Sequence, residues 1–314
     1  MNTVYVLFGP TSSGKTALAL QLAQKLGCDI ISADSRQIYK FMDVGTGKRP
    51  ISNTIPLQKL DDKWLLDDVT VWGYDLTTPD KFFSAYDFAE FAHNKLSKLL
   101  PVTGKILLVG GTGFYVDIVT GRIKPSNVVP DLGLRTQLEE LSLEELQQKL
   151  HRLNPELSDR IDSKNPARLM RAIEIELNTA INKKPLSYLI NTRYVYIGLT
   201  APREFIYARA DLWVDTIWKN GLIAEVGNLI KLGYKDSPKM HGLVYKTALA
   251  YLQKELSEQE AIQRIKFDVH SYIRRQQTYF KKMIQELETS KETVKLLDIS
   301  KDDCADLIYN LING

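Results

Sequence analysis

The chain has 314 residues, of which 44% are hydrophobic and 25% are charged, a composition that excludes disordered, collagen-like and coiled-coil proteins. The net charge of +3 does not identify a nucleic-acid-binding protein, because such binding depends on how basic residues cluster on one face. The two cysteines, Cys28 and Cys304, make neither a disulfide framework nor a spaced zinc pair, which fits a reducing compartment.

The N-terminal residues show no targeting signal. Residues 1–8 are mostly apolar, but no basic region precedes them and they lead straight into a polar loop that contains glycine. No apolar run approaches the roughly 20 residues that a membrane helix needs. We therefore expect a cytoplasmic protein that does not associate with a membrane.

The first third of the chain alternates short apolar strands with helical patterns. Strands are predicted over residues 4–8, 30–33 and 105–109, and helices over residues 15–26 and 82–100. Gly27 follows the first helix where a left-handed cap residue is expected. This alternation predicts an α/β fold with a parallel sheet that is covered by helices on both faces.

The middle of the chain carries only helix signals, from about residue 131 to about residue 190. Ser142 and Glu145 form a capping box, and Asn154 and Asn165 each precede a proline at a first helical position. Three or four short helices in succession predict an inserted all-helical subdomain.

The sheet pattern returns after this insertion. A strand is predicted over residues 194–199, and two helices follow over about residues 204–231 and 257–287. We therefore predict a catalytic core made of residues 1–122 and 192–314, and a helical insertion over residues 123–191.

Residues 9–16 read Gly-Pro-Thr-Ser-Ser-Gly-Lys-Thr between a strand and a helix, which is the phosphate-binding loop pattern in its usual context. Such a loop turns backbone N–H groups toward phosphate oxygens at a helix N-terminus. Lys15 would neutralise a phosphate and the Thr16 hydroxyl would hold Mg²⁺. We predict that phosphate is bound by Gly9, Pro10, Thr11, Ser12, Ser13, Gly14, Lys15 and Thr16. The loop leaves the reaction open, because it can hold a nucleotide, a phosphoryl donor or a departing diphosphate.

Two further segments follow predicted strands. Asp34 precedes Ser35, Arg36 and Gln37, and Thr112 lies among three glycines. In a doubly wound sheet the carboxyl ends of these strands lie beside the phosphate loop, so Asp34 could act as a general base and the glycine turn could approach a ligand. An aspartate that only caps a turn, and a plain strand-to-helix turn, are the alternatives.

Basic residues gather in two places. One stretch belongs to the insertion, and the other belongs to the late helix, where aromatic residues are interleaved with the basic ones. This combination suits RNA, whose phosphates meet cations and whose unpaired bases stack on rings. The alternative is a solvated helix face with a buried aromatic stripe.

Taken in order, these segments resemble the tRNA dimethylallyltransferase family over nearly the whole chain. The resemblance rests on residues 9–16, 31–39, 42–48, 108–115 and 168–174, with residues 220–226 and 275–280 in addition. The first segment is general to phosphate-loop proteins, whereas residues 31–39 and 108–115 together are specific. The resemblance implies a P-loop NTPase-like fold with the helical insertion on the tRNA side.

The family implies a reaction in which a dimethylallyl group passes from dimethylallyl diphosphate to the exocyclic N6 amine of an adenosine next to the anticodon in tRNA. Asp34 would take the amine proton, Thr112 would position the adenine, and Arg209 would stabilise the diphosphate, with Mg²⁺ as cofactor at Thr16. The implied tRNA contacts are Asp34, Ser35, Arg36, Gln37, Thr112, Arg135, Ala167, Arg168, Leu169, Met170 and Arg171. We expect a monomer.

The chain departs from the family's pattern at residues 71–74, Trp213, Val244 and residues 269–271, which leaves tRNA contacts near the late helix open. A small-molecule P-loop kinase is the alternative function, in which the loop would hold ATP and Asp34 would deprotonate a hydroxyl. A non-catalytic RNA-binding protein is a third, although the intact Lys15, Thr16 and Asp34 argue against it.

Overall fold

The computed structural model describes residues 2–49, 55–126, 128–178, 184–301 and 304–313. Its sheet has eight strands in the order β3-β4-β5-β2-β6-β1-β7-β8. The strands are β1 (Asn2–Phe8), β2 (Ile30–Ser32), β3 (Leu57–Lys59), β4 (Lys63–Leu66), β5 (Val69–Trp72), β6 (Lys105–Gly110), β7 (Thr192–Thr200) and β8 (Val294–Asp298). Strands β5, β2, β6, β1, β7 and β8 are parallel, which confirms the predicted parallel sheet.

Neither edge of the sheet was predicted: β8 forms one edge, and β3, β4 and β5 lie toward the other. Strands β3, β4 and β5 pair antiparallel, so the sheet is mixed. Each has only three or four residues, too few for alternation to stand out. Asp67 and Asp68 turn the chain between β4 and β5 with φ of 51° and 63°, a conformation that aspartate tolerates better than most residues.

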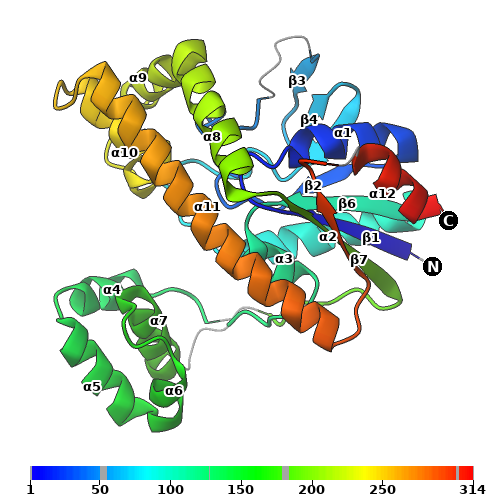
Figure 1. Ribbon diagram of the computed structural model, residues 1–314. Helices are drawn as coiled ribbons and strands as arrows, with labels where there is room; N and C mark the ends of the chain where they lie inside the picture. The colour runs from blue at the N-terminus through cyan, green and yellow to red at the C-terminus, as the bar shows by residue number, and fades with distance from the viewer. Residues whose placement is uncertain (1, 50–54, 127, 179–183, 302–303, 314) are drawn as a thin grey trace. The chain divides into compact units, whose positions relative to one another are not determined.

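Helices cover both faces of the sheet, as predicted (Figure 1). Alternate residues of β1, such as Tyr5 and Leu7, pack in one core with α1 (Lys15–Leu26) and α12 (Cys304–Asn313). The other face carries α2 (Ala85–Thr103), α3 (Gly113–Val119) and α11 (Glu258–Thr289), where the Phe8 ring lies 5.2 Å from the Phe280 ring. Buried apolar residues on both faces hold the strands that end at the site.

The helix predicted over residues 204–231 is broken. Helix α8 (Arg203–Ile217) passes through a π-helical turn, Trp218–Leu222, before α9 (Ile223–Lys231) begins. Gly221 has a φ of 116° inside this turn, which ends regular helix geometry. The chain then forms α10 (Leu243–Leu252), a helix that was not predicted.

Helix α11 begins where it was predicted, because the Ser257 hydroxyl accepts a hydrogen bond from the Glu260 N–H in a capping box. Its 32 residues run past α10, α8 and α3 (Figure 1). Helix α11 therefore contacts both the helices α8 and α10 and the segment after β6 that carries the glycine turn.

Residues Lys124–Ser187 form a compact unit separate from the unit made of Met1–Ile123 and Tyr188–Gly314. The described residues of the smaller unit form α4 (Leu132–Glu139), α5 (Leu143–Leu153), α6 (Pro155–Arg160) and α7 (Pro166–Leu177). The predicted caps are confirmed: Ser142, Asn154 and Asn165 each accept a hydrogen bond from a first-turn N–H. Buried leucines of α4, α5 and α7 make its core.

Two chain-wide expectations concern membrane-spanning helices and cysteines. Within the described ranges, no helix is both long enough and apolar enough to cross a membrane. Both cysteines are free and buried, and burial raises the pKa of the Cys28 thiol to about 12.

Candidate active site

A cavity of about 370 Å³ lies at the carboxyl ends of β1, β2 and β6. It brings together the phosphate loop, the segment after β2 and the glycine turn after β6, as expected for this edge of a doubly wound sheet. The polar side chains of its lining include Thr11, Ser12, Lys15, Thr16, Ser32, Asp34, Arg36, Gln37, Thr46, Arg49 and Arg209. Apolar side chains such as Leu20, Val71 and Val109 line the same space.

The phosphate loop has the backbone that its sequence predicts. Ser12 and Gly14 have φ of 65° and 80°, so the chain curls between β1 and α1. The Arg209 Nε donates to the Ser12 carbonyl at 2.9 Å, which brings its guanidinium against the loop. The Ser12 Oγ is buried and has no hydrogen-bond partner among the described residues. A phosphate oxygen would satisfy such a hydroxyl.

Lys15 lies at the start of α1 with its ammonium turned back over the loop, where the Nζ donates to the Pro10 carbonyl at 2.7 Å. Burial lowers the pKa of Lys15 to about 8, and the nearby Asp34 carboxylate opposes this shift. A buried cation of this kind gains most from an anionic ligand, since the ligand would replace the lost hydration.

Asp34 makes a turn contact and also lines the cavity. Its Oδ1 accepts a hydrogen bond from the Arg36 N–H at 2.9 Å. Its Oδ2 faces Gly111, at 3.6 Å from where a Cβ on that residue would lie. Asp34 therefore caps its own turn, as the alternative interpretation proposed, while it also lines the space beside the phosphate loop.

Thr112 joins the glycine turn to the segment after β2. Its Oγ1 accepts a hydrogen bond from the Ser35 N–H at 3.0 Å and donates to the Ser35 Oγ at 3.2 Å. The flanking glycines permit close packing: a Cβ on Gly110 would lie 2.0 Å from the Ala33 carbonyl oxygen, and one on Gly113 would lie 2.4 Å from the Tyr279 ring. Packing, and not ligand approach alone, requires these two glycines.

Comparison with known proteins identifies the family of this chain. The family model described as IPP transferase matches residues 37–283, and over 296 residues the chain is 36% identical to the tRNA dimethylallyltransferase of Acetivibrio thermocellus, covering 90% of each. The chain belongs to the IPP transferase family. It is also 33% identical to the tRNA dimethylallyltransferase of Dictyoglomus turgidum, over 98% of this chain and 91% of that protein.

Solved structures support the same fold. The tRNA isopentenylpyrophosphate transferase of Bacillus halodurans aligns with a TM-score of 0.68 at 29% identity, covering 100% of this chain and 96% of that one. A eukaryotic dimethylallyltransferase acting on tRNA aligns with a TM-score of 0.73 at 21% identity, over 95% of this chain and 74% of that one, and shows the fold alone.

A loop over residues 43–47 forms another wall of the cavity in this IPP transferase family member. Gln37 is buried, and its Nε2 donates to the carbonyls of Thr46 and Gly47 at 3.3 and 3.4 Å. Gln37 was expected to contact tRNA, and the structure directs its side chain inward to this loop.

Glu225, on α9, is a site residue that sequence reasoning did not single out. Its carboxylate accepts hydrogen bonds from the N–H groups of Asp43, Val44 and Gly45 at 2.7, 2.7 and 3.0 Å, and from the Tyr245 hydroxyl at 2.8 Å. Three of these four donors belong to the loop and the fourth to α10, so the carboxylate holds the loop firmly and ties it to that helix. The only sequence feature that pointed to Glu225 was the resemblance of residues 220–226 to the tRNA dimethylallyltransferase family.

Lys48 ends this loop and is fully buried. Its Nζ donates to the Tyr39 carbonyl at 2.6 Å, to Asp43 at 2.9 Å and to Asp75 at 2.5 Å, which uses all three ammonium hydrogens. Asp43 also pairs with Lys59. Burial raises the pKa of Asp43, but Lys48 and Lys59 more than offset this and bring it below its usual value.

We expect Lys48→Met to destabilise the protein by about 3–5 kcal/mol, because the buried Asp43 and Asp75 carboxylates would lose their shared cation. The free energy of unfolding, from urea titration, measures this effect. Lys40→Met, at an exposed lysine of the same segment, is the matched control and should stay within about 0.5 kcal/mol of wild type. Equal stability of the two variants would show that Lys48 does not hold the loop.

Three cations lie over the rings of Tyr272 and Tyr39 near the rim of the cavity. The Cζ atoms of Arg36 and Arg275 each lie 5.8 Å from the Tyr272 ring centroid, and the Lys239 Nζ lies 4.9 Å from the Tyr39 ring. Burial, and then the Arg36 charge, lower the pKa of Lys239. Within the described part of the chain none of these three cations is in an ion pair. The rim can therefore offer positive charge to an anionic partner.

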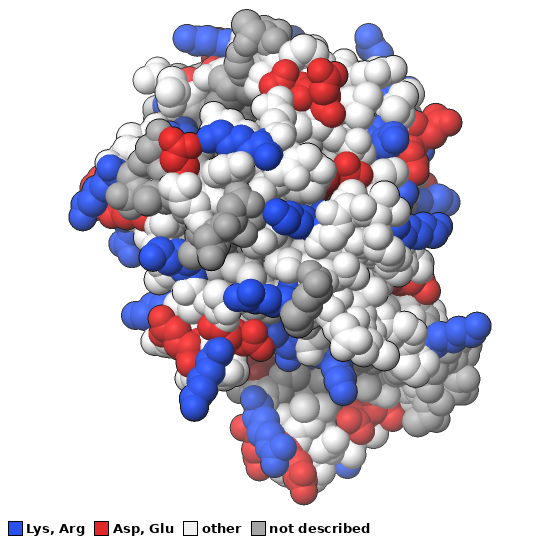
Figure 2. All heavy atoms as spheres, turned by 90° about the vertical axis from the view of Figure 1, so that its right-hand side faces the viewer, with Lys and Arg blue, Asp and Glu red and all other residues white. Residues whose placement is uncertain are grey.

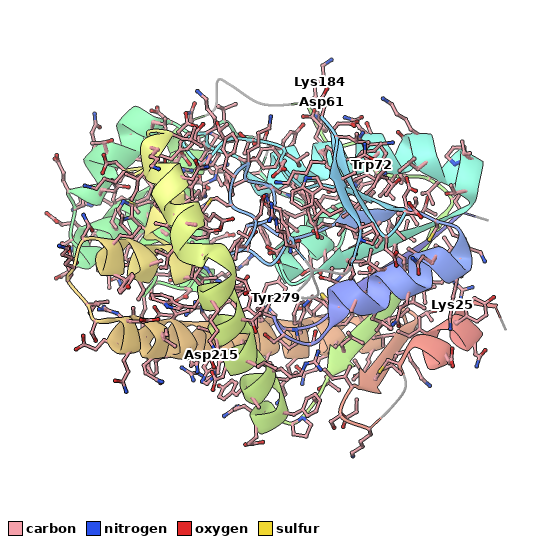
Figure 3. All side chains as sticks on the ribbon, turned by 90° about the horizontal axis from the view of Figure 1, so that it is seen from above. Lys25, Asp61, Trp72, Lys184, Asp215 and Tyr279 are labelled. Atoms are coloured by element: carbon pink, nitrogen blue, oxygen red, sulfur yellow. The ribbon has the colours of Figure 1, made fainter. Side chains whose placement is uncertain are left out.

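Much of the late helix's polar face is occupied by α8. The His270 Nε2 lies 2.8 Å from an Asp211 oxygen, and the Tyr207 ring stacks on the His270 ring at 3.9 Å. Lys266 pairs with Asp215, which is labelled where α8 crosses α11 in Figure 3. These residues join two helices that line the cavity, so only part of the predicted basic stretch is free for RNA.

The insertion's predicted tRNA residues differ in exposure. Arg135 donates to the buried Glu174, and Arg171 donates to Glu174 and to the Val128 carbonyl. Burial raises the pKa of Glu174, but hydrogen bonds from Arg135, Arg171 and the Asp131 N–H outweigh burial and lower it. The Leu169 side chain lies in the core of the insertion.

Other predicted residues of the insertion are accessible. Ala167 is exposed, Met170 is half-buried and the Arg168 side chain is 63% exposed.

On the face of the molecule drawn in Figure 2, basic and acidic side chains of the described residues are interspersed, so that face is not a surface of one charge.

Proposed function

We propose that this protein transfers a dimethylallyl group from dimethylallyl diphosphate to the N6 amine of an adenosine next to the anticodon in tRNA, and releases diphosphate. One observation carries the proposal within the family: the phosphate-loop lysine and the Asp34 carboxylate line the same cavity, whose remaining lining is largely apolar. The loop suits a diphosphate, the apolar side chains suit a five-carbon group, and the carboxylate suits an amine.

The residues divide the reaction between them. The amine nitrogen forms a bond to the allylic carbon while the bond from that carbon to the diphosphate oxygen breaks. Lys15, Arg209 and the loop N–H groups stabilise the charge that grows on the departing diphosphate. Asp34 accepts the proton that the amine loses.

The residues around Thr16 fit Mg²⁺. Thr16 lines the cavity next to Lys15, and its hydroxyl supplies one of the oxygen ligands that this ion prefers. The described residues contain no group of three or more acidic, histidine or cysteine side chains that could hold a metal. Apart from the Thr16 hydroxyl, the diphosphate oxygens would therefore supply most of the ligands of the Mg²⁺ ion. The ion would neutralise charge on the leaving group.

The acceptor adenosine must leave its stack to reach Asp34. We propose that the rim cations Arg36, Lys239 and Arg275 bind the phosphates beside the displaced nucleotide, and that exposed residues of the insertion bind the anticodon stem. We also propose that the enzyme is cytoplasmic, which the two free, buried cysteines support because they fit a reducing compartment. We further propose that it is a monomer.

We expect Arg168→Ala to weaken tRNA binding and to reduce the slope of log Kd against log salt by about 0.7–0.9, as the loss of one phosphate contact would. Arg168 is a better test than Arg171, because removing Arg171 would also take an ion-pair partner from the buried Glu174 carboxylate. The control is Arg193→Ala, at the amino end of β7 and so at the opposite end of the sheet from the site. A slope like that of wild type would remove Arg168 from the tRNA interface.

The proposed reaction is tested with unmodified tRNA, Mg²⁺ and labelled dimethylallyl diphosphate. Label in the tRNA, at an adenosine beside the anticodon, is the expected result. A parallel reaction with ATP and candidate hydroxyl acceptors tests the kinase alternative. Phosphoryl transfer from ATP with no label in tRNA would overturn the proposal.

A further inference from the structure

Gln276 links the phosphate loop to the glycine turn from a position far away in the chain. It lies on α11, is 5% exposed, and has no role in the functions assigned above. Its Oε1 accepts a hydrogen bond from the Thr11 N–H at 2.8 Å, and its Nε2 donates to the Gly111 carbonyl at 2.8 Å. One partner is a donor and the other an acceptor, so together they set which way the amide points.

The contacts of Gln276 continue into the acceptor side of the site. Gly111 precedes Thr112, whose hydroxyl bonds to Ser35, and Ser35 follows Asp34. A continuous path of hydrogen bonds and short chain segments therefore runs from the phosphate loop, through the Gln276 amide, to the turn that carries the proposed base. A Cβ on Gly111 would lie 2.7 Å from the Gln276 Nε2, so the glycine leaves room for the amide.

We propose that Gln276 is a positioning residue, which sets the distance and orientation of the bound diphosphate relative to Asp34 and Thr112. This inference rests on the proposed function. Transfer requires the allylic carbon and the amine nitrogen to meet in line, and small displacements of bound reactants cost large factors in rate. Each substrate would still bind to its own loop without Gln276, but the two loops would no longer be held in register.

The test compares Gln276→Met with wild type in steady-state transfer of labelled dimethylallyl group to tRNA. Methionine keeps the length of the side chain and loses both hydrogen bonds. We expect kcat to fall by about ten- to a hundredfold, in line with the loss of two buried hydrogen bonds, with each KM within about threefold of wild type. The control is Gln277→Met, the adjacent half-buried glutamine on the same helix, which does not line the cavity and should keep wild-type kinetics.

A double-mutant cycle separates positioning from general stability. Gly111→Ala should lower kcat, because its methyl group would displace the amide, but it should cost much less in a Gln276→Ala background, where that space is empty. Melting temperatures show whether a variant loses rate or only folded protein. If Gln276→Met does not fold, Gln276→Glu decides, since it keeps an acceptor for the Thr11 N–H and loses the donor to Gly111.

The outcomes are distinct. An unchanged kcat in Gln276→Met overturns this inference alone. If the methionine variant does not fold, an unchanged kcat in Gln276→Glu does the same. Fully additive effects of Gly111→Ala and Gln276→Ala also overturn it. A wild-type enzyme that transfers no label overturns the proposed function, and this inference with it.

Discussion

Asp34→Asn should reduce kcat for dimethylallyl transfer by about 10²–10⁴, the usual contribution of a general base. Asparagine has the same shape, and its Oδ1 can still accept the hydrogen bond from the Arg36 N–H. The turn that carries Ser35 and Arg36 should therefore persist, while the group that takes the amine proton is lost. Alanine would confound the test, because it would also leave that N–H without its acceptor.

Binding measurements separate the two roles of this aspartate. The Kd for tRNA should change by less than about threefold in Asp34→Asn, because the charge lost is one among many contacts. Asp61→Asn, at an exposed aspartate between β3 and β4 that is labelled in Figure 3, is the control and should keep wild-type kinetics. Full turnover by Asp34→Asn would remove Asp34 as the base.

Lys15→Met should lower kcat/KM for dimethylallyl diphosphate by about 10²–10³, the scale seen when one preorganised group that stabilises developing charge is removed. Methionine fills a similar volume at the start of α1 but offers no charge to the diphosphate. Steady-state kinetics at saturating tRNA measure the effect. The control is Lys25→Met. Lys25 pairs with Asp306 near the other end of α1 (Figure 3) and does not line the cavity, so its loss should leave the kinetics unchanged.

The pH dependence of the KM for dimethylallyl diphosphate tests whether Lys15 binds the diphosphate as a cation. Its pKa is lowered to about 8, so in the free enzyme the cation is present below that pH and is lost above it. The KM for dimethylallyl diphosphate should therefore rise above about pH 8 in wild type, approaching tenfold per pH unit, and should not show this rise in Lys15→Met. A wild-type profile that stays flat through pH 9 would show that Lys15 does not bind the diphosphate as a cation.

The elements that the sequence predicted well are those set by local patterns. The strands β1, β6 and β7 and the caps at Ser142, Asn154 and Ser257 follow from apolar runs and from side chains that bond within three residues. Several of the missed elements are short or interrupted: β3 and β4 have three and four residues, and the turn at Trp218–Leu222 divides one apparent helix. The ten-residue helices α10 and α12 were missed as well. Tertiary packing stabilises the short strands, which have too few residues for a periodic signal.

By itself, the sequence determined the phosphate loop, Asp34 and the glycine turn, because each depends on neighbouring residues in the segment that directly follows one strand. Only the tertiary structure decided how these parts are held. Thr11 and Gln276 are 265 residues apart, and Asp43 and Glu225 are 182 apart, yet each pair shares a hydrogen bond. It also showed that Arg171 pairs with a buried acid inside the insertion while Arg168 is mostly exposed. A single chain carries no local record of which distant polar group will satisfy a buried one, since that choice is made when helices and strands pack.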